Sequence, residues 1–122
     1  MKTGPVTEII IYVRDMAAQV SFYRDVLGLT VSYPADCADY TDEQWVTFAT
    51  GGCTLALHTG GKEKKNCDLP KVVFQVENVS EARKELAERG VNFGEPFSPA
   101  PGIIVSNGFD PEGNPLALES QE

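Results

Sequence analysis

Few residues of this sequence are suited to act as nucleophiles or soft metal ligands. The chain has one histidine, His58, and three cysteines, Cys37, Cys53 and Cys67. An odd number of cysteines without a C-x-x-C pair predicts neither a disulfide framework nor a thiolate metal site. We expect all three thiols to be reduced, with Cys53 serving as a small apolar residue within a strand. A Cys–His nucleophile would need His58, and no local pattern supports one.

The overall charge argues against several classes of partner. The 122 residues include 10 Lys and Arg against 18 Asp and Glu, a formal net charge of −8. Such a surface repels nucleic acid and anionic membranes, so neither is an expected partner. No apolar run approaches the roughly 20 residues that span a bilayer, and the N-terminus does not resemble a signal peptide. We therefore expect a cytoplasmic protein with a well-formed core, since 42% of the residues are hydrophobic.

Short strands and a helix must position the candidate residues of the first half. The β-branched residues of Val6–Val13 predict a strand. Asp15 then caps a helix that Gly28 ends, because aspartate accepts hydrogen bonds from free helix amides and glycine tolerates the left-handed conformation. Further strands are predicted at Leu29–Tyr33, Trp45–Thr50 and Cys53–His58.

The second half repeats this order after a polar linker at Gly60–Asp68. Asn78 caps a second helix, Glu81 completes a capping box, and Gly90 ends the helix. The Pro-rich segment Glu95–Pro101 is predicted to be a loop. The short segment Val91–Phe93 precedes it, and strands are predicted at Val72–Val76, Ile103–Phe109 and Leu116–Glu119.

The shared order of strands, caps and stop glycines predicts a tandem βαβββ repeat in an α+β fold. The predicted boundaries are residues 5–59 for the first module, 60–68 for the linker and 69–120 for the second module, within one domain of 1–122. Neither half is large enough to bury its helix and both faces of its sheet alone.

Alternation along each strand separates a helix-facing apolar set from a mixed set. In the first strand, Ile9, Ile11 and Val13 form the apolar set. The opposite faces combine aromatic, hydroxyl and charged side chains, as a small-molecule cleft does. The candidate ligand-binding residues on these faces are Glu8, Tyr12, Trp45, Thr47, Thr54, His58, Lys71 and Asn107.

Two motifs resemble those of one known family. The string FYRDVLGL at residues 22–29 and the turn DPEGNP at residues 110–115 are typical of the glyoxalase/bleomycin-resistance/extradiol-dioxygenase family, the vicinal oxygen chelate superfamily. The resemblance covers essentially the whole chain. It implies cupped sheets of mixed strands with helices packed outside. It also implies a homodimer whose small-molecule clefts are built by pairing modules.

The resemblance further implies where a divalent metal binds in enzymes of the family. The four ligand positions fall on Glu8, Ala56, Lys71 and Ala117. Only Glu8 can ligate, because alanine has no donor atom and a protonated ammonium has no lone pair. No cofactor is therefore expected, and an ion pair between Glu8 and Lys71 is predicted in place of the metal.

A shifted metal site is the alternative. His58 and Glu119 lie two residues beyond Ala56 and Ala117 on the same strand faces, so Glu8, His58 and Glu119 are its candidate ligands. Two residues along a strand span roughly 6–7 Å, so the whole site would have to move.

Three functions follow from these residues. The missing ligands favour a metal-free protein that binds or sequesters a small organic molecule. The alternatives are a metal-dependent lyase or dioxygenase of the superfamily and a metal-free enzyme with Lys71 or Glu8 as its acid or base.

Two loops are candidates to border the ligand. The acidic segment Pro34–Gln44 is a candidate lid, which would favour cationic ligands. Phe93, Phe97 and Pro99 are candidate walls on the other side.

Overall fold

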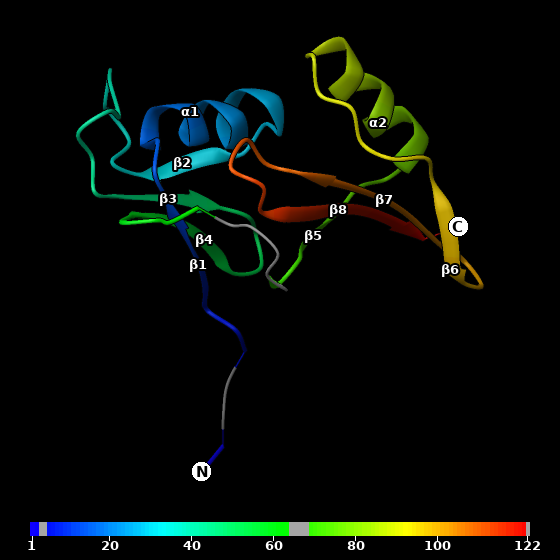
Figure 1. Ribbon diagram of the computed structural model, residues 1–122. Coiled ribbons are helices and arrows are strands. Elements are labelled where there is room, and N and C mark those ends of the chain that lie inside the picture. The colour runs from blue at the N-terminus through cyan, green and yellow to red at the C-terminus, as the bar shows by residue number, and fades with distance from the viewer. Residues whose placement is uncertain (3–4, 64–68, 122) are drawn as a thin grey trace. The chain divides into compact units, whose positions relative to one another are not determined.

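The computed structural model describes residues 1–2, 5–63 and 69–121 (Figure 1). The chain forms two compact units, Met1–Glu63 and Lys64–Glu122. Most of the predicted linker, with Cys67, lies outside the described residues.

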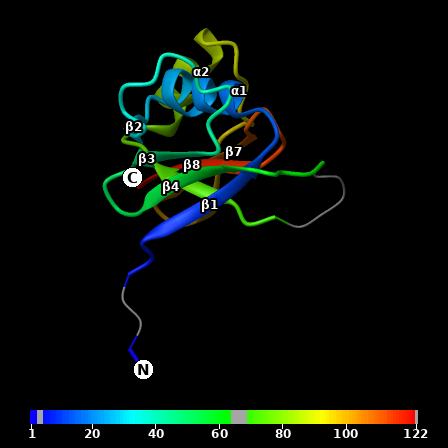
Figure 2. The same ribbon diagram turned by 90° about the vertical axis from the view of Figure 1, so that its left-hand side faces the viewer.

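The first unit contains one four-stranded mixed sheet in the order β1-β4-β3-β2. Its strands are β1 (Glu8–Val13), β2 (Thr30–Tyr33), β3 (Trp45–Ala49) and β4 (Thr54–Thr59). β1 runs parallel to β4, and β3 is antiparallel to both β4 and β2. Figure 2 shows β1, β4 and β3 side by side, with α1 (Met16–Ser21) lying over this sheet.

The predicted helix of the first unit begins as expected and then widens. Asp15 Oδ1 accepts a hydrogen bond from the amide of Ala18 at 3.0 Å, which caps α1. The next five residues, Phe22–Val26, form a π-helix, η1, in which the amide of Leu27 donates to the carbonyl of Phe22. Gly28, at φ 79°, ends the segment in the left-handed conformation.

The second unit repeats this topology with the sheet order β5-β8-β7-β6. Its elements are β5 (Val72–Gln75), α2 (Val79–Glu88), β6 (Phe97–Ala100), β7 (Ile103–Phe109) and β8 (Pro115–Gln121). Asn78 Oδ1 accepts from the amide of Glu81 at 2.9 Å, as the capping pattern predicts. The parallel pair β5–β8 matches β1–β4, so the predicted tandem βαβββ fold is confirmed.

Burial alternates along β1 and distinguishes the two faces of its sheet. Ile11 and Val13 are buried in β1, whereas Glu8, Ile10 and Tyr12 are exposed. Helix α1 packs on β4, and α2 packs on β7 and β8. The face of each sheet that bears the helix therefore holds the core, and we call the opposite faces the first and second open faces.

One predicted loop is wrong, because residues 97–100 within Glu95–Pro101 form strand β6. β6 lies at the edge of its sheet, where only β7 pairs with it. Pro99 is tolerated there because an edge strand does not need every amide for pairing. The register also shifts between Phe97 and Ala100.

Candidate functional site

The strand register brings the candidate residues of the first unit onto one surface. In the pairing of β1 with β4, Glu8 lies opposite Thr54 and Tyr12 lies opposite His58. In the pairing of β3 with β4, Trp45 lies opposite His58, so the three strands share this face. The first open face therefore holds Glu8, Ile10, Tyr12, Trp45, Thr47, Thr54, Ala56 and His58.

Three rings meet at one end of the first open face. The His58 ring centroid lies 5.3 Å from that of Tyr12 and 5.8 Å from that of Trp45. His58 Nδ1 lies 2.6 Å from the carbonyl oxygen of Thr59. Because a carbonyl only accepts, Nδ1 donates this bond, which leaves Nε2 as the ring nitrogen that can accept a hydrogen bond. This aromatic cluster offers flat surfaces and one nitrogen acceptor.

A hydroxyl pair lies beside the middle of the same face. Ser32 Oγ and Thr47 Oγ1 are 2.8 Å apart, which joins β2 to β3 through their side chains. Thr47 is buried and Ser32 is exposed, so the pair extends from the sheet toward its edge. The predicted site residue Thr47 therefore has a polar partner, Ser32, that sequence reasoning missed.

The second open face carries a lysine held by an amide. Lys71 precedes β5, and its Nζ donates a hydrogen bond to Asn107 Oδ1 of β7 at 3.0 Å. β8 lies between these two strands, with Ala117 opposite both Val73 and Asn107. Two predicted site residues of this unit are thus in direct contact.

The donor atoms at the family positions do not fit a divalent metal. On the first open face, Glu8 lies opposite Thr54 of the neighbouring strand, and Ala56 is the next residue of that strand on this face. His58 lies opposite Tyr12, which is four positions beyond Glu8. Four residues along a strand span roughly 13 Å, so Glu8 and His58 cannot share an ion. Among the described parts of the chain, no three His, Cys, Asp or Glu side chains are placed to hold one.

In the second unit, Lys71 occupies one such position as an exposed side chain hydrogen-bonded to Asn107. A cationic ammonium repels a metal ion and gives it no lone pair. Glu119 lies opposite Gln75 and is half-buried. The predicted ion pair between Glu8 and Lys71 joins residues of different units and stays a prediction.

The acidic segment Pro34–Gln44 is anchored on the helix-bearing side of the first sheet. Tyr40 is buried, and its hydroxyl donates to the carbonyl of Pro34 at 3.1 Å. The guanidinium of Arg24, in η1, lies 5.8 Å from the centre of the Tyr40 ring. Figure 1 shows this β2–β3 connection rising beside α1. The segment therefore packs beside the helix. This position does not support the expectation that it is a lid over the first open face.

Charged groups in this region shift one another's pKa values. Hydrogen bonding to Asp25 raises the pKa of Arg24, and hydrogen bonding to Arg24 lowers the pKa of Asp25. Hydrogen bonds from Thr41 lower the pKa of Asp39. These groups are exposed, so they order the surface locally without forming a reactive centre.

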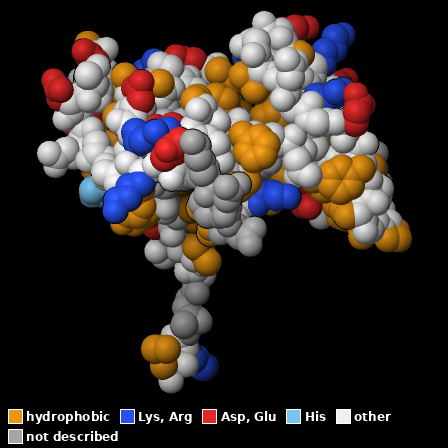
Figure 3. Space-filling model, in the orientation of Figure 1, with side chains coloured by type: hydrophobic (Ala, Val, Ile, Leu, Met, Phe, Trp, Pro, Cys, Tyr) orange, Lys and Arg blue, Asp and Glu red, His pale blue; other side chains and the backbone are white. Residues whose placement is uncertain are grey.

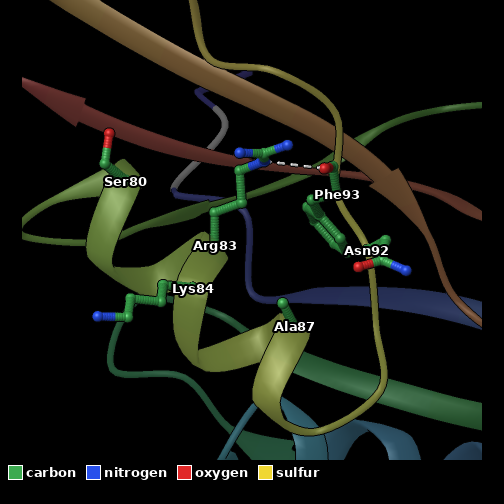
Figure 4. A pocket seen from close by; sticks show the side chains of 6 residues that line it. All are labelled: Ser80, Arg83, Lys84, Ala87, Asn92 and Phe93. Carbon is green, nitrogen blue, oxygen red and sulfur yellow. Dashed lines mark hydrogen bonds between the residues drawn. The ribbon is translucent and has the colours of Figure 1, made fainter.

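A cavity of about 280 Å³ lies between α2 and the segment that follows it (Figure 4). Arg83 Nε donates to the carbonyl of Phe93 at 3.0 Å, and its Nη2 binds Glu95 at 2.9 Å. In Figure 4, Ser80 and Lys84 point away from this contact. Arg83 therefore ties the chain after α2 to the helix, and the polar side chains of the cavity do not converge on a common point.

Phe93 is buried, and the structure corrects its proposed place as a wall of the ligand site. Its ring lies against Gly108, which shares a strand face with Ser106 and faces Leu116 in the core. Phe97 is exposed and lies opposite Val105 of β7. Val105 and Asn107 lie on the same face of that strand. Figure 3 shows hydrophobic side chains at the surface in several places.

Two four-stranded mixed sheets, each formed by a βαβββ unit with one helix-free face, define the class of this protein. The chain belongs to the Glyoxalase/Bleomycin resistance protein/Dioxygenase superfamily, whose family profile matches residues 6–118. Among curated proteins, none matches the chain in sequence at a significant level.

Solved structures share the fold at low identity. A glyoxalase/bleomycin resistance protein/dioxygenase from Nocardioides has a TM-score of 0.78 at 18% identity, covering 99% of this chain and 85% of that one. Lactoylglutathione lyase from Agrobacterium tumefaciens has a TM-score of 0.74 at 20% identity, covering 98% and 96%. TnmS3, an antibiotic binding protein from Streptomyces sp. CB03234, has a TM-score of 0.76 at 21% identity, covering 100% and 99%.

The helices of the described residues are short. None of them combines the length and the apolar character needed to cross a membrane.

Proposed function

We propose that this protein binds a small organic molecule at its open sheet faces without a metal ion. The observation that carries the proposal is the hydrogen bond of Lys71 to Asn107, at a position where the family places a metal ligand. A lysine there supplies a positive charge of its own and disfavours a second cation. The alanines at positions 56 and 117 add space without donor atoms.

The aromatic cluster supports binding of a flat molecule. Tyr12 is 52% exposed although it lies beside the ring of His58. Aromatic faces that remain accessible stack with planar ligands and recognise them with little loss of side-chain entropy. The structural similarity to TnmS3, which is an antibiotic binding protein, is consistent with binding as the activity.

A homodimer and a cytoplasmic setting are parts of the proposal. Large apolar side chains on the open faces, including Ile10 at 42% and Val73 at 50% exposure, are suited to be covered by ligand or by a second copy. Size-exclusion chromatography with light scattering would test the dimer, and a strictly monomeric mass would contradict it.

Trp45 provides a direct test of binding, because it is the only tryptophan of the chain and belongs to the aromatic cluster. Aromatic and cationic compounds would be screened by thermal shift, and hits would be titrated by Trp45 fluorescence. We expect saturable changes in emission that persist after treatment with EDTA. Tyr12→Phe should retain binding, whereas Tyr12→Ala should weaken it because the stacking surface is lost.

Two results would contradict the proposal. One is the absence of any hit in a broad screen. The other is calorimetric evidence of tight Zn²⁺, Ni²⁺, Mn²⁺ or Fe²⁺ binding on which ligand affinity depends.

A further inference from the structure

We propose that Lys71, held by Asn107, anchors the carboxylate of an organic anion on the second open face. The inference rests on the proposed function, because it names the chemical class of the ligand. It replaces the preference for cationic ligands that the acidic segment Pro34–Gln44 suggested.

The first argument is that the Lys71 ammonium is held in place. β5 and β7 are separated by β8, so two strand spacings, roughly 9–10 Å, lie between them. The lysine crosses this distance to reach Asn107 Oδ1 at 3.0 Å. Ala117 lies opposite Asn107 on β8, and its methyl group leaves room for the crossing side chain. The positive charge is therefore fixed over the sheet.

The second argument is that the charge is not neutralised within its own unit. In the part of the second unit that the structure describes, Lys71 forms no ion pair, and its contact is the neutral amide of Asn107. Glu119 lies two positions beyond Ala117 on the same face of β8, roughly 6–7 Å along the strand, and among the described residues it forms no ion pair with Lys71. An ammonium has three N–H donors, and Asn107 accepts from one of them.

The third argument is that exposed apolar side chains lie on the same sheet face as this cation. Val73, Phe97 and Phe109 are 50%, 47% and 65% exposed, and their strand positions place them on the second open face. A charged hydrogen bond strengthens as apolar groups exclude water from it. A single cation suits a monoanion, and a net charge of −8 disfavours a dianion such as a phosphate. A carboxylate on an apolar body therefore matches this face.

The test compares 1-naphthoate with its neutral analogue 1-naphthamide by calorimetry and by NMR shifts of the Asn107 side-chain amide. The wild-type protein should bind the carboxylate about tenfold more tightly. Lys71→Met should abolish this preference, whereas Lys71→Arg should retain it because the charge is kept. Asn107→Asp should also abolish it, since an isosteric carboxylate would keep the hydrogen bond and neutralise the ammonium.

Lys84→Met is the matched control, because Lys84 is an exposed lysine of the same unit that lies on α2. It should leave the preference unchanged. Circular dichroism would establish that each variant is folded. Equal binding of the amide would overturn the inference and leave the proposed function standing. Failure of both probes to bind at about 10 mM would also overturn the inference. The broader thermal-shift screen would then decide the proposed function separately.

Discussion

The ring of Phe93 fills the space next to Gly108 that a side chain at position 108 would otherwise occupy. A Cβ atom at Gly108 would lie 2.6 Å from Phe93 Cγ, well inside van der Waals contact. Both residues are buried, so a side chain at position 108 would force the Phe93 ring to shift within a packed region.

We therefore expect Gly108→Ala to destabilise the protein by about 1–3 kcal/mol through overpacking. Urea denaturation would measure the change. Gly94→Ala is the control, because its Cβ would meet the carbonyl of Asn107 at an ordinary 3.4 Å. Combining Gly108→Ala with Phe93→Leu should recover part of the loss, and equal stabilities of Gly108→Ala and the wild type would contradict the packing described here.

Asp110 organises the turn before β8. Its carboxylate accepts from the amides of Glu112 and Asn114 at 2.9 and 3.0 Å, and from Asn114 Nδ2 at 2.6 Å. Asp110→Ala would leave buried donors without this acceptor, so we expect a loss of about 2–3 kcal/mol in the free energy of unfolding. Asp110→Asn should lose less, because its amide oxygen still accepts. An alanine variant as stable as the asparagine variant would contradict this account.

Replacement of two buried serines on the core side of the second sheet by alanine should have different effects on stability. Ser106 Oγ donates to the carbonyl of Gly94 at 2.7 Å. Ser120 Oγ has no hydrogen-bond partner among the residues that the structure describes. We expect Ser106→Ala to cost about 1 kcal/mol, whereas Ser120→Ala should be neutral or stabilising, because it removes an unsatisfied hydroxyl. Thermal unfolding of the two variants would show this order, and the reverse order would refute it.

The Asp39 carboxylate makes local order in the acidic segment dependent on pH. It accepts from Thr41 N at 2.9 Å and Thr41 Oγ1 at 2.6 Å, which lowers the pKa of Asp39. A folded pKa below the unfolded one means that this stabilisation is complete above the unfolded pKa. It is lost as the pH falls through the folded pKa.

We expect the amide resonance of Thr41 to titrate with Asp39 when the pH is lowered from about 6 to about 2. Two-dimensional NMR would follow both residues. Asp39→Asn should remove the titration at Thr41 and keep an acceptor oxygen. A Thr41 amide that titrates equally in this variant would show that another group controls it.

Glu8→Gln tests the predicted ion pair with Lys71. If the pair forms, the glutamate competes with a bound carboxylate for the ammonium. The variant should then bind 1-naphthoate about three- to tenfold more tightly, because the competing charge is removed and the side-chain shape is kept. Calorimetry would measure this, with Lys71→Met/Glu8→Gln as the double variant that should show no gain. An unchanged affinity would mean that Glu8 and Lys71 do not pair.

Local sequence was sufficient to predict most of the fold. Caps at Asp15 and Asn78 and stop glycines at Gly28 and Gly90 act through nearby backbone groups, so their effects are visible in short windows. Strand β6 was missed because an edge strand containing Pro99 depends on its pairing with β7 more than on its own residues.

For the candidate site, the sequence predicted which sheet faces carry its residues but not the contacts between their side chains. Alternation placed Tyr12, His58 and Trp45 on one surface, but their ring contacts depend on the register of three strands. The contact of Lys71 with Asn107 depends likewise on a lysine crossing an intervening strand. The position of the acidic segment depends on Tyr40 and Arg24, which no local pattern connects.

The separation of each sheet into a core face and an open face has a consequence for protein engineering. Leu57 and Leu118 stabilise the two units from the helix-bearing sides, while the ligand candidates lie on the other sides of the same strands. Residues of one open face can therefore be exchanged for their counterparts in the repeat, such as Glu8 with Lys71, without repacking either core. The duplicated scaffold is thus suited to libraries in which binding specificity is varied while folding is conserved.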